Sequence, residues 1–308
     1  MSSRWLSVQI MATLGFAGSA AAIAPTSPGA LNYVEGSVAV NGRDLTSAAI
    51  GSANLQPGST LTTGQGKAEI LLTPGVFLRV GSNSEVRMVS AGLTDTRLIL
   101  DRGVALLEAN EVHKENSIRI ANTGLNTLVK KNGLYRFDAD RSSMAVFDGK
   151  AEVREEDEKV DVKKGRKVIS GQEELKPEKF DRDEAKKTDD PYQWSNLRSK
   201  YLSQASAATA RRVVLQPSAW YGGGWYWNPG WRTYAWLPGG NPYFSSFGYG
   251  FYSPWRPYVP FYYSSPRYNG RIGVSPGRGS WQRSYPQGRG SSGMSRQSTG
   301  RSGGRGRR

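Results

Sequence analysis

Short runs of alternating apolar and polar residues occupy most of the chain between residues 31 and 171. Each run has five to seven residues and a period of two, which is the pattern of a half-buried strand. Glycines, which tolerate the backbone of tight turns, separate most of the runs, and none has the longer period of a helix. The runs are VEGSVAV (34–40), KAEILLT (67–73), VFLRV (76–80), TRLIL (96–100), GVALLEA (103–109), SIRIA (117–121), GLYRFDA (133–139) and MAVFDG (144–149).

A weak internal repeat favours a mainly β architecture of stacked units. Three segments share a glycine followed by alternating apolar residues: VEGSVAV (34–40), DRGVALL (101–107) and FDGKAEV (147–153). Because one such unit cannot bury a face by itself, repeated units are expected to stack on one another. We therefore expect a β-solenoid, or a sandwich of the same short strands.

The same region resembles a known family. The segment LQPGSTLTTGQGKAEILLTPGVFLRVGSNSEVRM (55–88) is similar to the FecR-type domain, and the resemblance continues through VFDGKAEV (146–153) and VDVKKGRKVIS (160–170). It implies a FecR-like β domain over residues 31–171 that lies outside the cytoplasm. The usual threonine-proline turn of the family is Thr123-Gly124 here. FecR proper also carries an anti-sigma segment and a transmembrane helix before this domain. Here only a signal-like segment is expected before it, so the sigma-factor role is not carried over.

The first residues have the pattern of a secretory leader. Arg4 precedes a mostly apolar stretch over residues 5–18, and the small residues of SAAAIA follow it. We predict that residues 1–24 are a signal peptide that is cleaved, with a retained membrane anchor as the alternative. No other stretch reaches 18 apolar residues, so no integral membrane span is expected after cleavage. The protein is predicted to be periplasmic or secreted, in association with the outer membrane or the cell surface.

A charged linker and a helix are expected after the β domain. Residues 172–190 are polar and contain one proline, which is typical of a linker. For residues 191–215, Asp190 is the expected N-cap, with Pro191 at the first helical position and Gln193 at the third. An apolar stripe at spacings of three and four is expected to dock on the β domain; it consists of Trp194, Leu197, Tyr201, Ala205 and Ala208.

An aromatic extension rich in glycine and proline follows over residues 216–270. Two segments repeat weakly, GWYWNPGWRTY (224–234) and GFYSPWRPY (250–258). Either the rings pack on one another in a small β-like appendage, or they offer flat platforms to sugars, peptides or a membrane interface. Under the second interpretation the candidate ligand-binding residues are Trp225, Trp227, Trp231, Arg232, Trp236, Trp255, Arg256 and Tyr258.

Charge separates the two halves of the chain. Residues 31–188 contain 24 Lys and Arg and 24 Asp and Glu, whereas residues 189–308 contain 16 Lys and Arg and only two acids. Residues 271–308 form a tail of Arg, Gly and Ser that cannot bury enough apolar surface to become ordered. We therefore expect an envelope protein or an anionic surface polymer as partner: peptidoglycan, lipopolysaccharide or an acidic polysaccharide. Nucleic acid is a second, less favoured partner.

The sequence offers few of the residues on which enzymes most often rely for catalysis. The chain has no cysteine and one histidine, His113, in the polar segment EANEVHKENS. We predict no catalytic residue, no metal site and no cofactor. The sequence favours a non-enzymatic exported binding module, either an envelope scaffold or a sensor-like protein. The alternatives are an exported nucleic-acid-binding protein and, less favoured, a carbohydrate-active enzyme.

Overall fold

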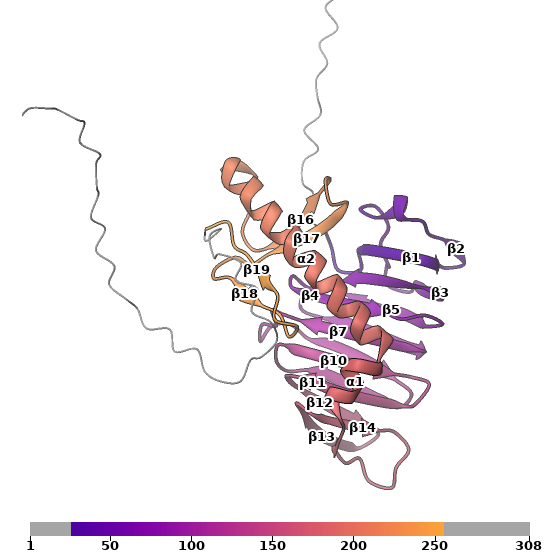
Figure 1. The fold of residues 1–308 in the computed structure, drawn as a ribbon. Helices are drawn as coiled ribbons and strands as arrows, with labels where there is room; N and C mark the ends of the chain where they lie inside the picture. The colour runs from indigo at the N-terminus through magenta and orange to yellow at the C-terminus, as the bar shows by residue number, and fades with distance from the viewer. Residues whose placement is uncertain (1–25, 256–308) are drawn as a thin grey trace, which may run out of the picture. The chain divides into compact units, whose positions relative to one another are not determined.

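The computed structural model describes residues 26–255. The predicted signal peptide, the whole predicted tail, and the last residues of the predicted extension with the candidates Arg256 and Tyr258 lie outside the described residues. The described segment is mainly β, as the sequence predicts, with helices only after the strands of the β domain apart from one short 3₁₀ turn (Figure 1).

The strands of the β domain are β1 (Leu31–Val40), β2 (Arg43–Asp44), β3 (Thr60–Leu71), β4 (Val76–Val80), β5 (Glu85–Ala91), β6 (Thr96–Arg102), β7 (Val104–Ala109), β8 (Ile118–Asn122), β9 (Leu125–Val129), β10 (Gly133–Asp138), β11 (Ser143–Asp148), β12 (Lys150–Glu155), β13 (Glu158–Lys163), β14 (Arg166–Ile169) and β15 (Glu178–Lys179). The later elements are α1 (Arg182–Thr188), α2 (Asp190–Leu215), β16 (Gly224–Asn228), β17 (Thr233–Leu237), β18 (Tyr243–Phe244) and β19 (Gly250–Phe251). Two 3₁₀ turns are η1 (Ser47–Ala49) and η2 (Pro217–Ala219).

The long strand β3 divides the sheet into two layers. The beginning of β3 pairs with β5, its end pairs with β4, and β1 pairs along its other edge. One layer continues from β5 through β6, β8, β9 and β12 to β13; the other continues from β4 through β7, β10, β11 and β14 to β15. At the far end β13 lies against β11 and β14, which brings the layers together again (Figure 1).

The pairing identifies the architecture as a folded sandwich. Among the described strands only β6 and β8 run parallel, and the other pairs are antiparallel. The parallel coils of a solenoid are therefore not present between most neighbours. The chain does progress in steps between the two layers. Gly103 and Gly149 of the weak repeat lie where the chain crosses from one layer to the other, whereas Gly36 lies within β1, so the three segments are not equivalent units.

The core lies between the two layers and follows the predicted period of two. Val76, Leu78 and Val80 on β4 point inward, as do Ala68 and Ile70 on β3, and all are fully buried. Inward residues of the opposite layer complete the cluster; they include Val86, Met88, Leu98, Leu100, Ile118, Ile120, Ala151, Val153 and Val162. Burial of this apolar surface is the main favourable term for the fold.

The layer that begins with β4 is buried on both faces. All five residues of β4 are buried, including Phe77 and Arg79 on its outward side. The outward side of this layer is covered by α2 and by the strands that follow it, since α2 contacts β4, β7, β16, β17 and β19. We call this side the covered face.

The predicted linker is partly structured, which corrects the sequence-based expectation for residues 172–190. It contains β15 and α1, and the Asp181 carboxylate caps α1 by accepting hydrogen bonds from the amides of Asp183 and Glu184. The N-cap of α2 is Asp189, one residue earlier than predicted. Arg136 of β10 forms an ion pair with Asp189, whereas Asp190 pairs with Lys67 of β3 at 2.8 Å. The two aspartates thus anchor the start of α2 to the sheet.

The buried stripe of α2 also differs from the predicted one. Trp194 and Ala205 are buried, but Leu197 is 64% exposed. The buried positions are mainly small or polar: Ser195, Arg198, Ser199, Ser203, Ser206, Thr209 and Ala210. A helix whose docking face is polar gives no apolar periodicity, and for this reason the pattern failed to identify the face. No described helix is long and apolar enough to cross a membrane.

Candidate binding surface

Most rings of the aromatic extension pack internally. β16 and β17 form a hairpin, and β18 pairs with β19. Trp225 and Trp236 are 6% and 0% exposed and lie in a cluster with Phe77 of β4 and Leu202 of α2. The ring of Trp225 meets Phe77 edge-on with 4.9 Å between centroids. These two candidates cannot present a ring face to a ligand, because their rings are buried against the covered face of the sheet and against α2.

The remaining described candidates are more accessible. Trp227 and Trp231 are half-buried, and the rings of Tyr234 and Tyr201 pack edge-on against them at 5.1 and 4.9 Å. Arg232 is exposed and donates to the Ser47 carbonyl at 3.4 Å. Trp255, the last described candidate, is 72% exposed. Of the six described candidates, two are therefore buried, two are half-buried and two are exposed.

A different surface remains open to solvent. It is the outward side of β5, β6, β8, β9, β12 and β13, which we call the open face. Inward positions on these strands are apolar and buried, so the alternate positions must point outward. Its outward side chains are Glu85, Arg87, Val89, Arg97, Ile99, Asp101, Arg119, Ala121, Asn126, Leu128, Lys150, Glu152, Arg154, Lys159, Asp161 and Lys163.

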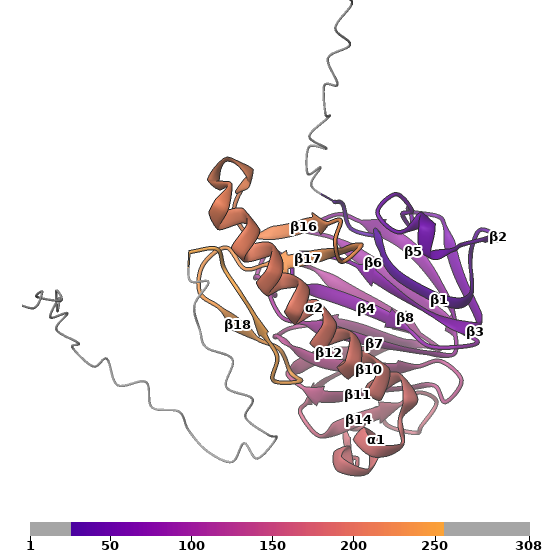
Figure 2. The same ribbon diagram turned by 45° about the horizontal axis from the view of Figure 1, so that its top comes forward.

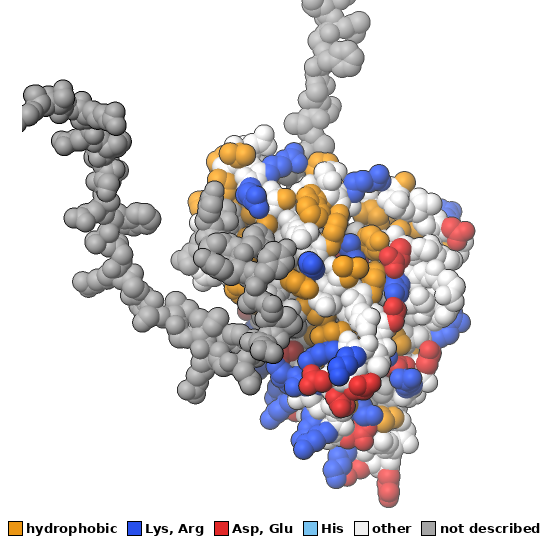
Figure 3. Space-filling model, in the orientation of Figure 1, with side chains coloured by type: hydrophobic (Ala, Val, Ile, Leu, Met, Phe, Trp, Pro, Cys, Tyr) orange, Lys and Arg blue, Asp and Glu red, His pale blue; other side chains and the backbone are white. Residues whose placement is uncertain are grey.

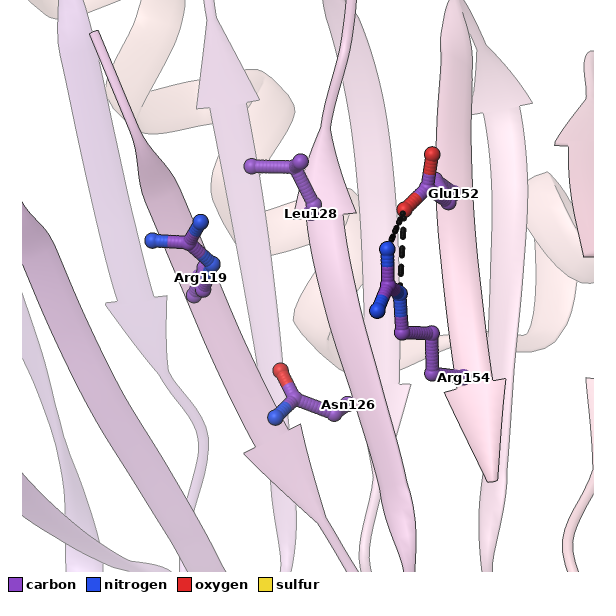
Figure 4. A pocket seen from close by; sticks show the side chains of 5 residues that line it. All are labelled: Arg119, Asn126, Leu128, Glu152 and Arg154. Carbon is purple, nitrogen blue, oxygen red and sulfur yellow. Dashed lines mark hydrogen bonds and ion pairs between the residues drawn. The ribbon is translucent and has the colours of Figure 1, made fainter. Parts of the chain in front are cut away.

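A shallow depression lies on the open face where β8, β9 and β12 run side by side. Arg119, Asn126, Leu128, Glu152 and Arg154 line it (Figure 4). Leu128 is in register with Arg119 on one side and with Glu152 on the other, while Asn126 is in register with Arg154. The depression therefore has an apolar position at its centre and a guanidinium group on each side.

Positive charge exceeds negative charge around this depression. Glu152 has three cationic partners, Lys130 at 3.3 Å, Arg154 at 3.1 Å and Lys159 at 3.4 Å. Partial desolvation opposes ionisation of Glu152, but hydrogen bonds from Arg154 and Lys130 outweigh it and lower the pKa of the carboxyl group. Arg119 donates to Ser117 and lies 3.7 Å from Asp95. One carboxylate cannot neutralise three cations, so the surroundings favour an anionic ligand.

A second group of charges is sealed beneath α2. The Arg79 Nε donates to Glu69 Oε2 at 2.8 Å, and its Nη1 donates to Glu108 Oε2 at 2.6 Å. Arg198 of α2 donates to Glu69 Oε1 at 2.9 Å, and Ser199 donates to Glu108 Oε1 at 2.9 Å. The side chains of Arg79, Glu69 and Glu108 are fully buried. We call Glu69, Arg79, Glu108 and Arg198 the buried charge cluster; it holds α2 on the sheet and is closed to solutes.

The single histidine lies in an exposed loop. The His113 side chain is 62% exposed, and its Nε2 lies 3.3 Å from Glu111 Oε1. In the described residues no group of three or more His, Cys, Asp and Glu side chains could hold a metal ion.

Comparison with known proteins identifies a family match within the β domain. Residues 59–152 match the family model described as FecR protein. The chain contains a FecR domain. The matched segment includes β5, β6, β8 and β9 and most lining residues of the depression, whereas Arg154, α2 and the aromatic extension follow it. No curated protein matches the chain.

Two similar solved structures are each described as the crystal structure of a proposed anti-sigma factor from Parabacteroides distasonis. They are 13% and 12% identical to this chain, with TM-scores of 0.34 and 0.35. The similarity covers 39% and 40% of this chain and 58% and 60% of those chains. This chain therefore spans less than two thirds of the length of either structure.

Sequence reasoning missed the depression. The period of two does place Arg119, Leu128 and Arg154 on outward positions of their strands. However, β12 pairs with β9, which is not its neighbour in sequence, and only this pairing brings the two arginines to one site.

Proposed function

We propose that this chain is an exported, non-enzymatic FecR-domain protein of the cell envelope that binds an anionic surface polymer through its open face. The FecR match and the leader-like first residues support the location. The observation that carries the polymer contact is the depression, where Arg119 and Arg154 flank Leu128 and cations exceed carboxylates.

The chemistry of the depression suits a sugar polymer that carries carboxylate or phosphate groups. Arginine donates two parallel hydrogen bonds to such groups, and an apolar side chain between two arginines can pack on the apolar face of a sugar ring. Peptidoglycan, lipopolysaccharide and acidic polysaccharides all offer this combination. The further charges on neighbouring strands extend the contact along a chain of repeating units.

A comparison of two arginine variants tests this proposal in the full chain. Arg119→Gln removes a guanidinium that donates to Ser117 and lies 3.7 Å from Asp95, and we expect binding to the preferred polymer to weaken by about tenfold or more. The matched control is Arg141→Gln, because the Arg141 side chain is also exposed and has a similarly long ion pair, 4.0 Å from Asp138, but lies between β10 and β11, outside the open face. The control is expected to bind like the wild type.

Binding should be measured on peptidoglycan, lipopolysaccharide, an acidic polysaccharide and single-stranded DNA, at low and high salt. The arginine-rich tail is identical in both variants, so their difference reports on the open face alone. Equal losses in both variants would reduce the contact to nonspecific charge, and unchanged binding in both would exclude the open face. A preference for single-stranded DNA would support a nucleic-acid partner instead.

A further inference from the structure

The C-terminal end of α2 exposes a group of apolar side chains. Leu215 is 82% exposed and Val214 is 43% exposed, and Tyr221 follows the 3₁₀ turn η2 with 78% exposure. We call Val214, Leu215, Trp220 and Tyr221 the helix-end patch. A single exposed leucine is ordinary, but two aliphatic and two aromatic residues within eight positions form a patch that requires explanation.

Contacts of the buried Tyr226 fix the backbone of the helix-end patch. The buried ring of Tyr226 stacks on Trp220 with 5.5 Å between centroids and packs against Val213 and neighbouring alanines of α2. Its hydroxyl oxygen accepts a hydrogen bond from the Tyr221 amide at 3.1 Å and donates to the Gly222 carbonyl at 2.6 Å. The exposed side chains are therefore presented on a fixed backbone, and the end of α2 extends beyond the strands beside it (Figures 1 and 2).

Positive charge accompanies the patch. Arg211 and Arg212 are exposed near the C-terminal end of α2, and neither has an ion pair within the described residues. Residues 191–255 contain no Asp or Glu. Figure 3 shows apolar and basic side chains, and no acidic one, over this end of α2. The potential next to the patch is therefore positive, which suits an anionic partner.

The chain beyond the described residues adds to this charge. Tyr252 belongs to the same apolar cluster as Val213, and three residues span at most about 10 Å, so the exposed Trp255 is close to the patch by connectivity alone. The segment that follows, residues 256–308, contains 11 arginines and no acid.

We propose that the helix-end patch docks on an anionic phospholipid surface. Leu215 and Tyr221 enter the boundary between headgroups and acyl chains, and Arg211 and Arg212 contact the lipid phosphates. Aliphatic side chains beside Trp, Tyr and Arg are the composition that membrane interfaces select. A negatively charged protein partner would need phosphate or carboxylate groups beside an apolar surface. An anionic lipid surface provides both over its whole area. This contact uses a surface other than the open face and goes beyond the proposed polymer binding.

Vesicle binding by the full chain tests the proposal. Co-sedimentation is measured with vesicles of phosphatidylcholine alone and of phosphatidylcholine mixed with phosphatidylglycerol. The double variant Leu215→Ser with Tyr221→Ser is expected to weaken binding to the mixed vesicles by about tenfold or more. The matched control is Leu197→Ser with Phe244→Ser, because these residues are also exposed, at 64% and 60%, but lie outside the patch. The control is expected to bind like the wild type.

Salt separates the patch from the tail. At high salt the attraction of the arginine-rich tail is screened, so the residual binding reports apolar insertion and should differ most between the two double variants. Equal binding of both variants would overturn the proposal. A wild-type dimer in vesicle-free solution that Leu215→Ser with Tyr221→Ser converts to a monomer would also overturn it, in favour of a second copy. Arg119→Gln should leave vesicle binding unchanged, so a failure of either proposal is recognised separately.

Discussion

Arg79 is a residue whose environment differs from what the sequence pattern predicts. In the run VFLRV its outward position is typical of a solvated arginine, yet its side chain is fully buried between Glu69 and Glu108. Removal of such a cation from water costs several kcal/mol, which good geometry and paired carboxylates must offset. Arg198 supplies the fourth charge from α2, and its guanidinium lies 4.0 Å from the centroid of the Tyr33 ring. Two cations and two carboxylates make the cluster neutral.

Acid should weaken the protein through Glu69. Burial by itself would raise the pKa of this carboxyl group, but Arg198 and Arg79 reverse the effect and lower it from 4.5 to about 2. Because the pKa is lower in the folded state, the contribution of Glu69 to stability is complete above about pH 4.5 and is lost as the pH falls toward 2.

Glu69→Gln is therefore expected to be less stable than the wild type at neutral pH and to lose less stability between pH 4.5 and 2. Urea unfolding at several pH values checks this. Glu85→Gln on β5 is the matched control, since Glu85 is partly exposed and lies 3.9 Å from Arg102; its profile should follow the wild type. Parallel profiles for all three proteins would show that Glu69 is not the group that acid titrates.

At the scale of the element, α2 docks through hydroxyl groups. Ser203 donates to the Gly250 carbonyl at 2.6 Å, and Ser206 donates to the Trp236 carbonyl at 2.8 Å. Ser206 also accepts from the Tyr252 amide at 3.1 Å. These small residues let the helix approach closely while they satisfy backbone groups of the aromatic extension, which would otherwise be buried without partners.

Ser206→Ala should loosen the extension. The substitution removes the partner of two buried backbone groups, and we expect a loss of about 1–3 kcal/mol in the free energy of unfolding. Hydrogen exchange of the Tyr252 amide should accelerate in the variant. Gln204→Ala, on an exposed position of the same helix turn, is the control and should change neither quantity. Unaltered exchange at Tyr252 in Ser206→Ala would refute the role assigned to the hydroxyl.

At the scale of the molecule, the sandwich, α2 and residues 220–252 form one folded unit. The buried charge cluster joins β3, β4 and β7 to α2, and Trp236 and Trp225 join the extension to Phe77. An isolated covered face would expose Phe77, Leu106, Leu134 and a set of unpaired charges, so the sandwich and its cover stabilise each other.

The two parts are therefore expected to unfold together. All described tryptophans lie in α2 or in the extension, so tryptophan fluorescence reports on the cover, while far-ultraviolet circular dichroism mainly reports on the sheet. In urea the two transitions should have the same midpoint. A fluorescence transition at a clearly lower urea concentration would mean that the cover detaches before the sandwich unfolds.

The sequence by itself indicated eight strands of the sandwich, their inward faces and the FecR resemblance, but not strands such as β5 and β9. A period of two with glycine turns is a local property, and residues such as Val76, Leu78 and Val80 are buried wherever their strands pair. For the aromatic extension the sequence left two interpretations open, and the hairpin of β16 and β17 agrees with the first of them, a β-like appendage.

Only the tertiary structure decided which outward faces are covered and which are free. Arg79 and Arg119 occupy equivalent outward positions on strands, yet the first is buried under α2, whereas the side chain of the second is 42% exposed. No local pattern separates them, because coverage depends on contacts between residues more than a hundred positions apart, such as Glu69 with Arg198. The polar docking face of α2 and the burial of Trp225 and Trp236 follow from the same long-range contact, since a face that carries charged groups must be matched by hydrogen-bonding side chains and sealed by large rings.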